Sequence, residues 1–292
     1  MGIRHVSNNY LLCSRLCGSM LKTLAIHRQS ATCNLSFPCL LLASIVLLSP
    51  ALFADSPLLA KRIRQAYIGA RSHYQAAATN ATAAWEYGRA AFDLADLTND
   101  DQERKDVAQA GIDACRHAIA LQSDSAAAHY YLALNLGELA KTKKLAALRL
   151  LHEMEHELIK ATQADPAFDY GGPDRSLGML YLEAPGWPTS VGNRSKAREH
   201  LEHAVQIAPD FPDNHITLAE AYAKWGEARN LQRELNSLDQ LLVRAKARFT
   251  GTAWQASWED WEARIDKLRK AEERLATNPP ISPAERGARR VK

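Results

Sequence analysis

The chain has 292 residues, of which 47% are hydrophobic, so it is long and apolar enough to bury the core of one or two domains. Its formal charge of +3 is misleading, because residues 1–54 hold four bases and no acid and the remaining chain carries a small net negative charge. A mildly acidic body argues against a nucleic-acid surface. Four of the five cysteines lie in the first forty residues, so Cys115 stands alone in the body. The body therefore lacks an internal disulfide or a cysteine zinc site, and we expect Cys115 to be a small core residue.

Residues 1–54 are predicted to be a leader. Residues 40–48 form an apolar run, LLLASIVLL, that is shorter than the roughly 20 residues needed to cross a bilayer. Bases precede this run, and Pro50 and Ala54 follow it, which is typical of a signal peptide cleaved before Asp55. An uncleaved anchor is the alternative, and Met20 is an alternative start. We expect an exported chain that is periplasmic or associated with the cell envelope.

Residues 55–276 are predicted to form one helical domain. Helices are expected over residues 58–78, within 77–97, from a cap at residues 98–101 to about 121, from Ser125 onward, over 227–249 and over 253–276. The elbow after the helix that begins at Ser125 is expected to be solvated, because it carries Lys141, Lys143 and Lys144. Residues 277–292 combine prolines with bases and are predicted to be a disordered tail.

The last predicted helix carries three tryptophans on one stripe. Trp254, Trp258 and Trp261 are spaced at i, i+4 and i+7. We interpret this helix as a cap that closes the apolar end of a stack of helices. The alternative is a docking face for a partner or a membrane surface.

A repeating pattern dominates residues 165–226. Leu177-Gly178 is followed two residues on by Tyr181, and Ala197, Leu201, Ala204 and Pro209 give the pattern A-x3-L-x2-A-x4-P. Small alanines allow two helices to approach closely, and proline ends the second helix. Similar offsets recur about 43 residues earlier, so we predict stacked antiparallel helix pairs of unusual length. The fold class is all-α, an α-solenoid with a C-terminal capping helix.

This pattern resembles tetratricopeptide repeats over roughly residues 80–250. The resemblance implies that the first helix of each pair lines a concave groove that binds peptides or protein partners. The positions carried over by register are Glu86, Tyr130, Arg175, Met179, Glu183, Glu220 and Lys224.

The elbow at residues 183–194 is the least generic loop of the chain. Pro185, Gly186 and Pro188 restrict its path, and Trp187 is expected near the surface. We expect this loop to bridge the two helices and cover the core beneath it. The alternative is that Trp187 forms one wall of a ligand or partner site.

A narrower resemblance rests on three segments: Tyr170-Gly171-Gly172, Leu182 to Gly186, and Ser195 to Leu201. Together with a signal peptide and elongated repeats, they are similar to the T-component of tripartite ATP-independent periplasmic transporters. This resemblance implies a periplasmic helical protein that partners a substrate-binding protein. The chain departs from that family because Cys39 precedes the apolar run, so no lipid-attachment site follows it.

One segment matches a catalytic motif. His152-Glu153-Met154-Glu155-His156 fits H-E-x-x-H, in which two histidines hold zinc and the glutamate acts as general base. The repeat register turns Met154 inward and both histidines toward solvent, and no third ligand follows. We therefore expect no catalytic metal, although a zinc hydrolase stays the rival hypothesis. His200, His203 and His215 form a second cluster in the sequence, in which His200 and His203 are expected at the surface.

The sequence thus predicts an exported, non-enzymatic helical-repeat scaffold without a cofactor. It would bind a protein partner, such as a periplasmic substrate-binding protein, or an apolar ligand. A general scaffold for envelope assembly is an alternative, and a homo-oligomer is left open.

Overall fold

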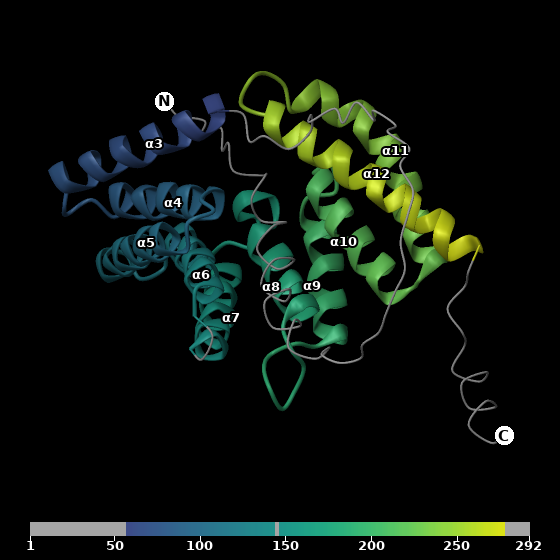
Figure 1. The fold of residues 1–292 in the computed structure, drawn as a ribbon, viewed down its shortest axis with the longest axis horizontal. Coiled ribbons are helices and arrows are strands. Elements are labelled where there is room, and N and C mark those ends of the chain that lie inside the picture. Colours follow the sequence, from purple (N-terminus) through teal and green to yellow (C-terminus); the bar gives the residue numbers. More distant parts are fainter. Residues whose placement is uncertain (1–56, 144–145, 278–292) are drawn as a thin grey trace, which may run out of the picture.

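The computed structural model describes residues 57–143 and 146–277, and this part of the chain is helical (Figure 1). The predicted leader and nearly all of the predicted tail lie outside the described residues. The first five helices are α3 (Pro57–Ala76), α4 (Ala81–Leu97), α5 (Asp101–Leu121), α6 (Ala126–Lys141) and α7 (Ala147–Ala164). A 3-10 turn, η2 (Phe168–Tyr170), precedes α8 (Gly172–Glu183), α9 (Arg194–Ile207), α10 (Pro212–Trp225), α11 (Ala228–Arg248) and α12 (Gln255–Thr277).

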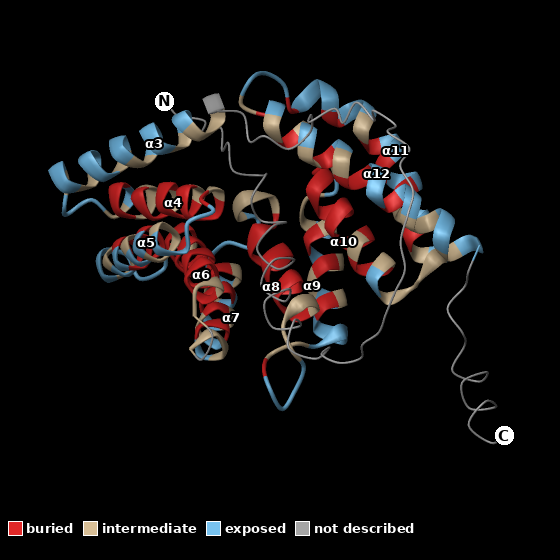
Figure 2. Ribbon diagram, viewed as in Figure 1, coloured by how far each residue is buried: buried red, intermediate tan, exposed pale blue. Residues whose placement is uncertain are grey.

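The helices stack as neighbouring pairs, which confirms the predicted α-solenoid. The pairs are α4 with α5, α6 with α7, α8 with α9, and α10 with α11, and each pair packs on the next (Figure 1). The first helices α6, α8 and α10 are buried along most of their length, whereas α3 and α11 are largely exposed (Figure 2). In the described part of the chain, no helix has the length and apolar character that crossing a membrane requires.

Polar side chains cap the starts of α4, α5, α6 and α9, and the starts of α5 and α6 are those that the sequence predicted. Asn80 and Asn193 each accept two backbone N–H bonds at the start of α4 and α9, and Asp100 does the same for α5. Ser125 accepts from the amide of Ala128 at the start of α6. These side chains satisfy amide groups that have no partner within the helix. The predicted boundaries at residues 98–101 and at Ser125 are therefore confirmed.

Small residues set how closely the helices pack. A Cβ atom added at Gly178 would lie 2.5 Å from Cγ of Leu201, and one added at Gly88 would lie 2.1 Å from Sγ of Cys115. Leu201, Ala197 and Cys115 are fully buried. The repeat register and the core position of Cys115 are thus confirmed.

The last helix closes the aromatic end of the stack, as predicted. Trp261 is fully buried against Phe211, with ring centroids 5.6 Å apart, and Trp254 packs on Phe249 at 4.7 Å. Trp258 is half-buried and donates its indole N–H to the carbonyl of Phe249 at 2.7 Å. The tryptophan stripe therefore faces the core of the solenoid.

The prediction of a solvated lysine elbow is wrong for Lys141. Its side chain is only 8% exposed, and its Nζ donates to Glu138 at 2.6 Å and to Asp96 at 3.1 Å. Lys141 is the last residue of α6, and its amine lies between the buried side chains of Glu138 and Asp96. Lys143 is half-buried, and Lys144 lies outside the described residues.

The carboxyl group of Glu138 is expected to make stability depend on pH. Burial raises its pKa to about 8, with a further contribution from Asp96 and opposition from Lys141. Because this folded-state pKa lies above the ordinary glutamate value of 4.5, the stabilising contribution is complete below that value and is lost as the pH rises through about 8. Glu138→Gln should therefore flatten the loss of unfolding free energy across this range, measured by urea unfolding at several pH values.

The control for this measurement is Glu273→Gln, which alters an exposed carboxylate on α12. It should leave the pH profile of the wild type unchanged. Parallel pH profiles for Glu138→Gln and the wild type would show that the carboxyl group of Glu138 does not cause this pH dependence.

Candidate functional site: the charged inner face

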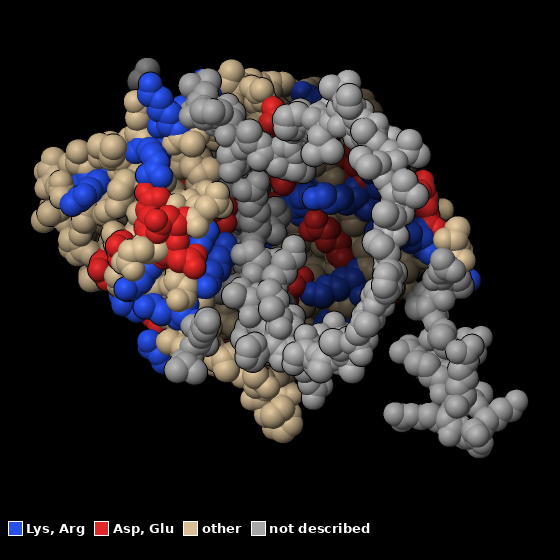
Figure 3. Space-filling model, viewed as in Figure 1, with Lys and Arg blue, Asp and Glu red and all other residues tan. Residues whose placement is uncertain are grey.

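The first helices of the pairs line one side of the solenoid, here called the inner face. α4 contacts α6, α8 contacts α10, and α10 contacts α12, so α12 continues this side beyond the last pair. Figure 3 shows basic and acidic side chains gathered near α10. A set of ionised side chains with short mutual distances, the inner-face ion chain, connects the helices of this side: Asp169, Arg175, Asp213, Glu220, Asp260 and Arg264.

Two arginines and two aspartates form the central part of the inner-face ion chain. The Nη2 atom of Arg175 lies 3.6 Å from Oδ2 of Asp169, and its Nε atom lies 3.2 Å from Oδ2 of Asp213. The other carboxylate oxygen of Asp213 accepts a 2.5 Å hydrogen bond from Arg264. Asp213 therefore bridges α8 and α12, and its own side chain is almost completely buried.

At the α12 end of the ion chain, Arg264 pairs with three carboxylates. Its Nε and Nη2 atoms donate to the two oxygens of Glu220 at 2.8 Å each, a paired geometry that suits a guanidinium. Its Nη1 atom also donates to Asp260 at 3.2 Å. One guanidinium thus faces Asp213, Glu220 and Asp260 together.

A strained turn positions Asp169, the first aspartate of the inner-face ion chain. Asp169 has φ 50° and ψ 43°, Tyr170 has φ 57° and Gly171 has φ 77°, so three consecutive residues are left-handed. Two of them are not glycine, and such positions persist when their surroundings hold them. The Tyr170 ring stacks on Phe211 at 4.6 Å, and Tyr130 donates its hydroxyl proton to Asp169 at 3.3 Å.

Asn214 holds Arg175 and the neighbouring backbone of the inner face in place through hydrogen bonds. Its Oδ1 accepts from Nη1 of Arg175 at 2.7 Å, while its Nδ2 donates to the carbonyls of Tyr170 and Ala204 at 2.9 and 2.8 Å. The guanidinium of Arg175 also lies 5.3 Å from the centre of the Phe211 ring. One amide side chain therefore ties α10 to the turn before α8 and to the end of α9.

The inner-face ion chain carries more acid than base. The ion chain has four carboxylates around two guanidinium groups. Burial, opposed by Arg264 and reinforced by Asp213 and Glu220, raises the pKa of Asp260 to about 6. On α4, burial raises the pKa of Asp93 to about 7, opposed by Arg89. Carboxylates with raised pKa values mark a place where an additional cation would be stabilised.

The structure connects three of the predicted site residues. Tyr130, Arg175 and Glu220 all belong to the ion chain or touch it directly. Glu183 and Lys224 form their own ion pair at 2.7 Å, which joins the ends of α8 and α10.

The remaining predicted site residues lie elsewhere or contribute differently. Glu86 is half-buried on α4, where its charge helps to raise the pKa of Arg89. Met179 is buried on α8. Trp187 lies apart from the others on the loop between α8 and α9, and its exposed fraction is 89%. The predicted surface position of Trp187 is therefore confirmed.

Sequence reasoning missed Asp169, Asp213, Asp260 and Arg264. Asp213 follows Pro212 at the start of a helix, where an acid ordinarily serves the helix dipole. Arg264 lies in a segment dense in charged residues, so its sequence context resembles a solvated face. Only the packing of α12 on α10 shows that Asp213, Asp260 and Arg264 belong to one set of ion pairs.

The segment that matches H-E-x-x-H is not arranged as a metal site. His152 and His156 are exposed, as predicted. Glu153 accepts a 2.5 Å bond from Arg116, and Glu155 accepts the hydroxyl proton of Tyr181 at 2.7 Å. Over residues 57–143 and 146–277, no group of three or more histidine, cysteine or acidic side chains could hold a metal ion.

The three other histidines do not form one cluster. His200 and His203 both approach Asp174, with Nδ1–oxygen distances of 2.7 and 3.1 Å. His203 is exposed, whereas His200 is half-buried, so the expected surface position holds fully only for His203. His215 is buried and instead contacts Glu234 at 2.9 Å.

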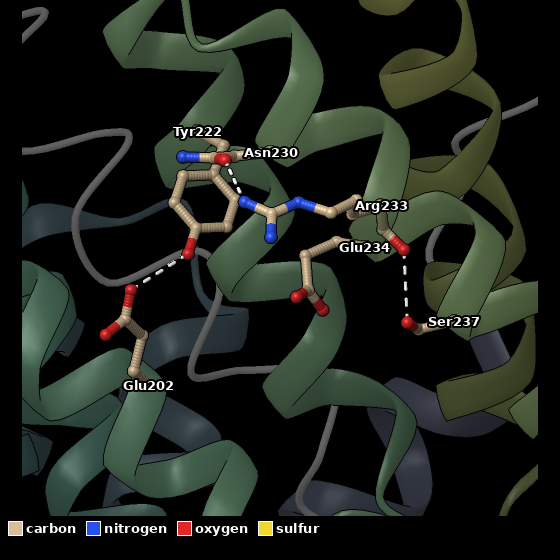
Figure 4. Close-up of a pocket in the computed structure, with 6 residues that line it drawn as sticks. All are labelled: Glu202, Tyr222, Asn230, Arg233, Glu234 and Ser237. Atoms are coloured by element: carbon tan, nitrogen blue, oxygen red, sulfur yellow. Dashed lines mark hydrogen bonds between the residues drawn. The ribbon is translucent and has the colours of Figure 1, made fainter.

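A polar pocket of about 370 Å³ lies between α9, α10 and α11 (Figure 4). Tyr222 donates its hydroxyl proton to Glu202 at 3.0 Å, and burial with this bond raises the pKa of Tyr222 to about 12. Ser237 donates its hydroxyl proton to the carbonyl of Arg233 at 3.0 Å. Because Ser237 is directed at a carbonyl and the raised pKa of Tyr222 disfavours its phenolate, this arrangement favours polar contacts over catalysis.

The fold and the inner face define a helical solenoid that presents paired charges from its first helices. Residues 54–169 match the model of a family described as regulator of microtubule dynamics protein 1-3. The match runs from the residues before α3 to Asp169, which is less than half of the chain. We found no match among the curated proteins.

Arg264→Gln tests the inner-face ion chain. The substitution leaves three partly buried carboxylates without the guanidinium they surround, so we expect the free energy of unfolding to fall by about 3–5 kcal/mol. Arg269→Gln is the matched control, because Arg269 pairs with Asp239 at 2.5 Å on the surface, with side chains 47% and 50% exposed. The control should cost less than about 1 kcal/mol. Equal losses in urea unfolding would show that Arg264 is not a buried support.

Proposed function

We propose that this protein is a non-enzymatic scaffold whose inner face binds a basic segment of a partner protein. The observation that carries the proposal is the excess of carboxylates around Arg175 and Arg264. An incoming lysine or arginine would add a further cation beside Glu220 and Asp260, which share Arg264 with Asp213. The helical-repeat architecture supports the proposal, because stacked pairs build extended surfaces suited to peptides.

The half-buried end of the ion chain is the proposed contact point. The side chains of Glu220 and Asp260 are 30% and 16% exposed, so both can be reached without unfolding the helices. Lys224 lies one turn beyond Glu220 but is paired with Glu183 at 2.7 Å, which limits its repulsion of a cationic ligand. A basic side chain near Asp260 would also lower the pKa of that carboxyl group toward its ordinary value.

We further propose that the chain acts outside the cytoplasm, as the predicted leader suggests. A periplasmic partner such as a substrate-binding protein is compatible with the resemblance to transporter T-components, and an envelope-assembly partner is the alternative. N-terminal sequencing of the chain from its native host tests this. A mature terminus at Asp55 supports export, and a retained leader in a cytoplasmic fraction counts against it.

Binding of a lysine-containing peptide tests the inner-face proposal. The probe is a labelled ten-residue peptide that alternates lysine with leucine and serine, and its counterpart carries glutamate in place of lysine. We expect the lysine peptide to bind at least about tenfold more tightly, a difference of about 1.4 kcal/mol. Asp260→Asn should weaken this binding by about threefold to tenfold, measured by fluorescence anisotropy. Added salt should weaken it further.

The pH dependence of this binding has a definite sign. Asp260 must be ionised to attract the cation, and its pKa is about 6, so affinity should rise as the pH increases through that value. Asp239→Asn, an exposed carboxylate on α11, is the matched control and should bind like the wild type. Equal affinity for the two peptides, or no effect of Asp260→Asn, would remove the support for this function.

A second candidate is regulation of microtubule dynamics, which the family match over residues 54–169 favours. The description of that family names an effect on a protein polymer, which accords with a binding role. Co-sedimentation with microtubules assembled from purified tubulin decides it. Saturable pelleting supports this candidate, and a chain that stays in the supernatant excludes it.

A further inference from the structure

Trp187 is the most exposed of the large hydrophobic side chains in the described part of the chain. It lies at the tip of the loop formed by residues 184–193, here called the Trp187 loop, and its exposed fraction is 89%. Figure 1 shows this loop projecting beyond the ends of α8 and α9. A tryptophan can bury roughly 150–250 Å², so leaving one in water forgoes a large stabilisation.

Backbone bonds brace this loop. Gly192 donates its N–H to the carbonyl of Pro185 and Asn193 donates to the carbonyl of Tyr181, both at 2.9 Å. A Cβ atom added at Gly192 would lie 2.1 Å from the carbonyl oxygen of Ala184, so only glycine allows the two arms to close this tightly. The loop therefore presents Trp187 on a preorganised support, which lowers the entropic cost of binding.

An aromatic pocket lies at the opposite end of the same helix pair. It has a volume of about 240 Å³. This is below the roughly 300–1,000 Å³ of typical small-molecule sites, and it suits one large side chain. We call it the Phe211 pocket, and the lining residues that matter here are Tyr170, Ile207, Ala208, Pro209, Phe211 and Arg248.

The chemistry of the Phe211 pocket fits an indole. Tyr170 stacks on the buried ring of Phe211 with ring centroids 4.6 Å apart, so the half-buried Tyr170 ring is the aromatic wall that an indole could contact. Arg248 lies 5.9 Å from the Tyr170 ring centre, where its guanidinium can also cover an inserted aromatic ring. Ala208 and Pro209 add apolar walls without filling the space.

The loop and the pocket cannot meet within one molecule. α8 begins just after Tyr170 and ends just before the Trp187 loop, and α9 returns from that loop to Ile207. The fourteen residues of α9 span about 21 Å between the two features. A side chain at one end and its complementary pocket at the other end are suited to a second copy of the chain.

We propose that Trp187 of one copy inserts into the Phe211 pocket of the next, so that the chain associates head to tail. Such an interface joins two different patches, and it extends in one direction unless the rotation closes a ring. It uses no residue of the inner-face ion chain and does not depend on the proposed function. One tryptophan buries far less than the roughly 1,200 Å² of a stable interface, so association should be weak and concentration-dependent.

Sedimentation velocity of the purified full chain over a wide concentration range tests this proposal. The wild type should shift toward larger species as concentration rises, and Trp187→Ala should remain monomeric. Ala208→Trp, which fills the pocket, should also remain monomeric. Circular dichroism melts check that both variants fold. Arg248→Ala provides a second pocket variant that leaves the helix packing intact, and it should weaken association several-fold.

Mixing the two blocked variants gives the decisive result. Trp187→Ala retains a pocket and Ala208→Trp retains a tryptophan, so an equal mixture should form one-to-one pairs that do not extend. A monomeric wild type at every concentration, or association unchanged in Trp187→Ala, overturns the proposal. A mixture that fails to pair does the same. Loss of binding to lipid vesicles in Trp187→Ala, without self-association in the wild type, would assign the loop to a membrane surface instead.

Discussion

Arg175 and Arg264 are almost completely buried, and a guanidinium group leaves water at tolerable cost only when carboxylates surround it. Asp213 lies between them and contacts both, so the position of α10 fixes the positions of α8 and α12. The left-handed turn at Asp169 follows from the same requirement, because it delivers another carboxylate to Arg175. Asn214 completes this arrangement by tying the turn before α8 to the end of α9. Apolar packing stacks the helices, and the ion chain fixes how the later pairs and the cap meet.

This arrangement gives the molecule two kinds of surface. The inner face is acidic and built from rigid first helices, so it discriminates by charge and keeps its carboxylates in place without a ligand. The ends of the α8–α9 pair are instead aromatic, with the Trp187 loop at one end and the Phe211 pocket at the other. Because the two surfaces share no residue, a partner on the inner face and a neighbouring copy at the ends could bind together. The family match covers α3 to α7 and stops at Asp169, so most of the ion chain lies outside the matched region.

Particular residues show how far sequence reasoning reached. Leu201 and Ala197 were assigned to the core from their spacing alone, and both are fully buried, because close helix packing demands small and apolar residues at fixed intervals. The register also selected Tyr130, Arg175 and Glu220, which the structure connects through the ion chain. Lys141 was assigned to solvent because lysines in a loop ordinarily are, yet two buried carboxylates from α4 and α6 hold it. Trp187 was expected near the surface because prolines and a glycine restrict its loop, and the braced loop does hold it in water.

By itself, the sequence determined the all-helical class, the paired repeats, the polar starts of α5 and α6 and the capping helix. These features depend on local periodicity, on side chains that bond their own neighbouring amides, and on residues that cannot continue a helix. Tertiary structure alone decided which charges are buried together and which face of α12 meets α10. It also decided that Trp187 and the Phe211 pocket lie at opposite ends of one pair. Ion pairs and pockets join residues tens of positions apart, such as Asp213 and Arg264, and no local pattern records such a pairing. It arises only when the apolar stack has brought the helices together.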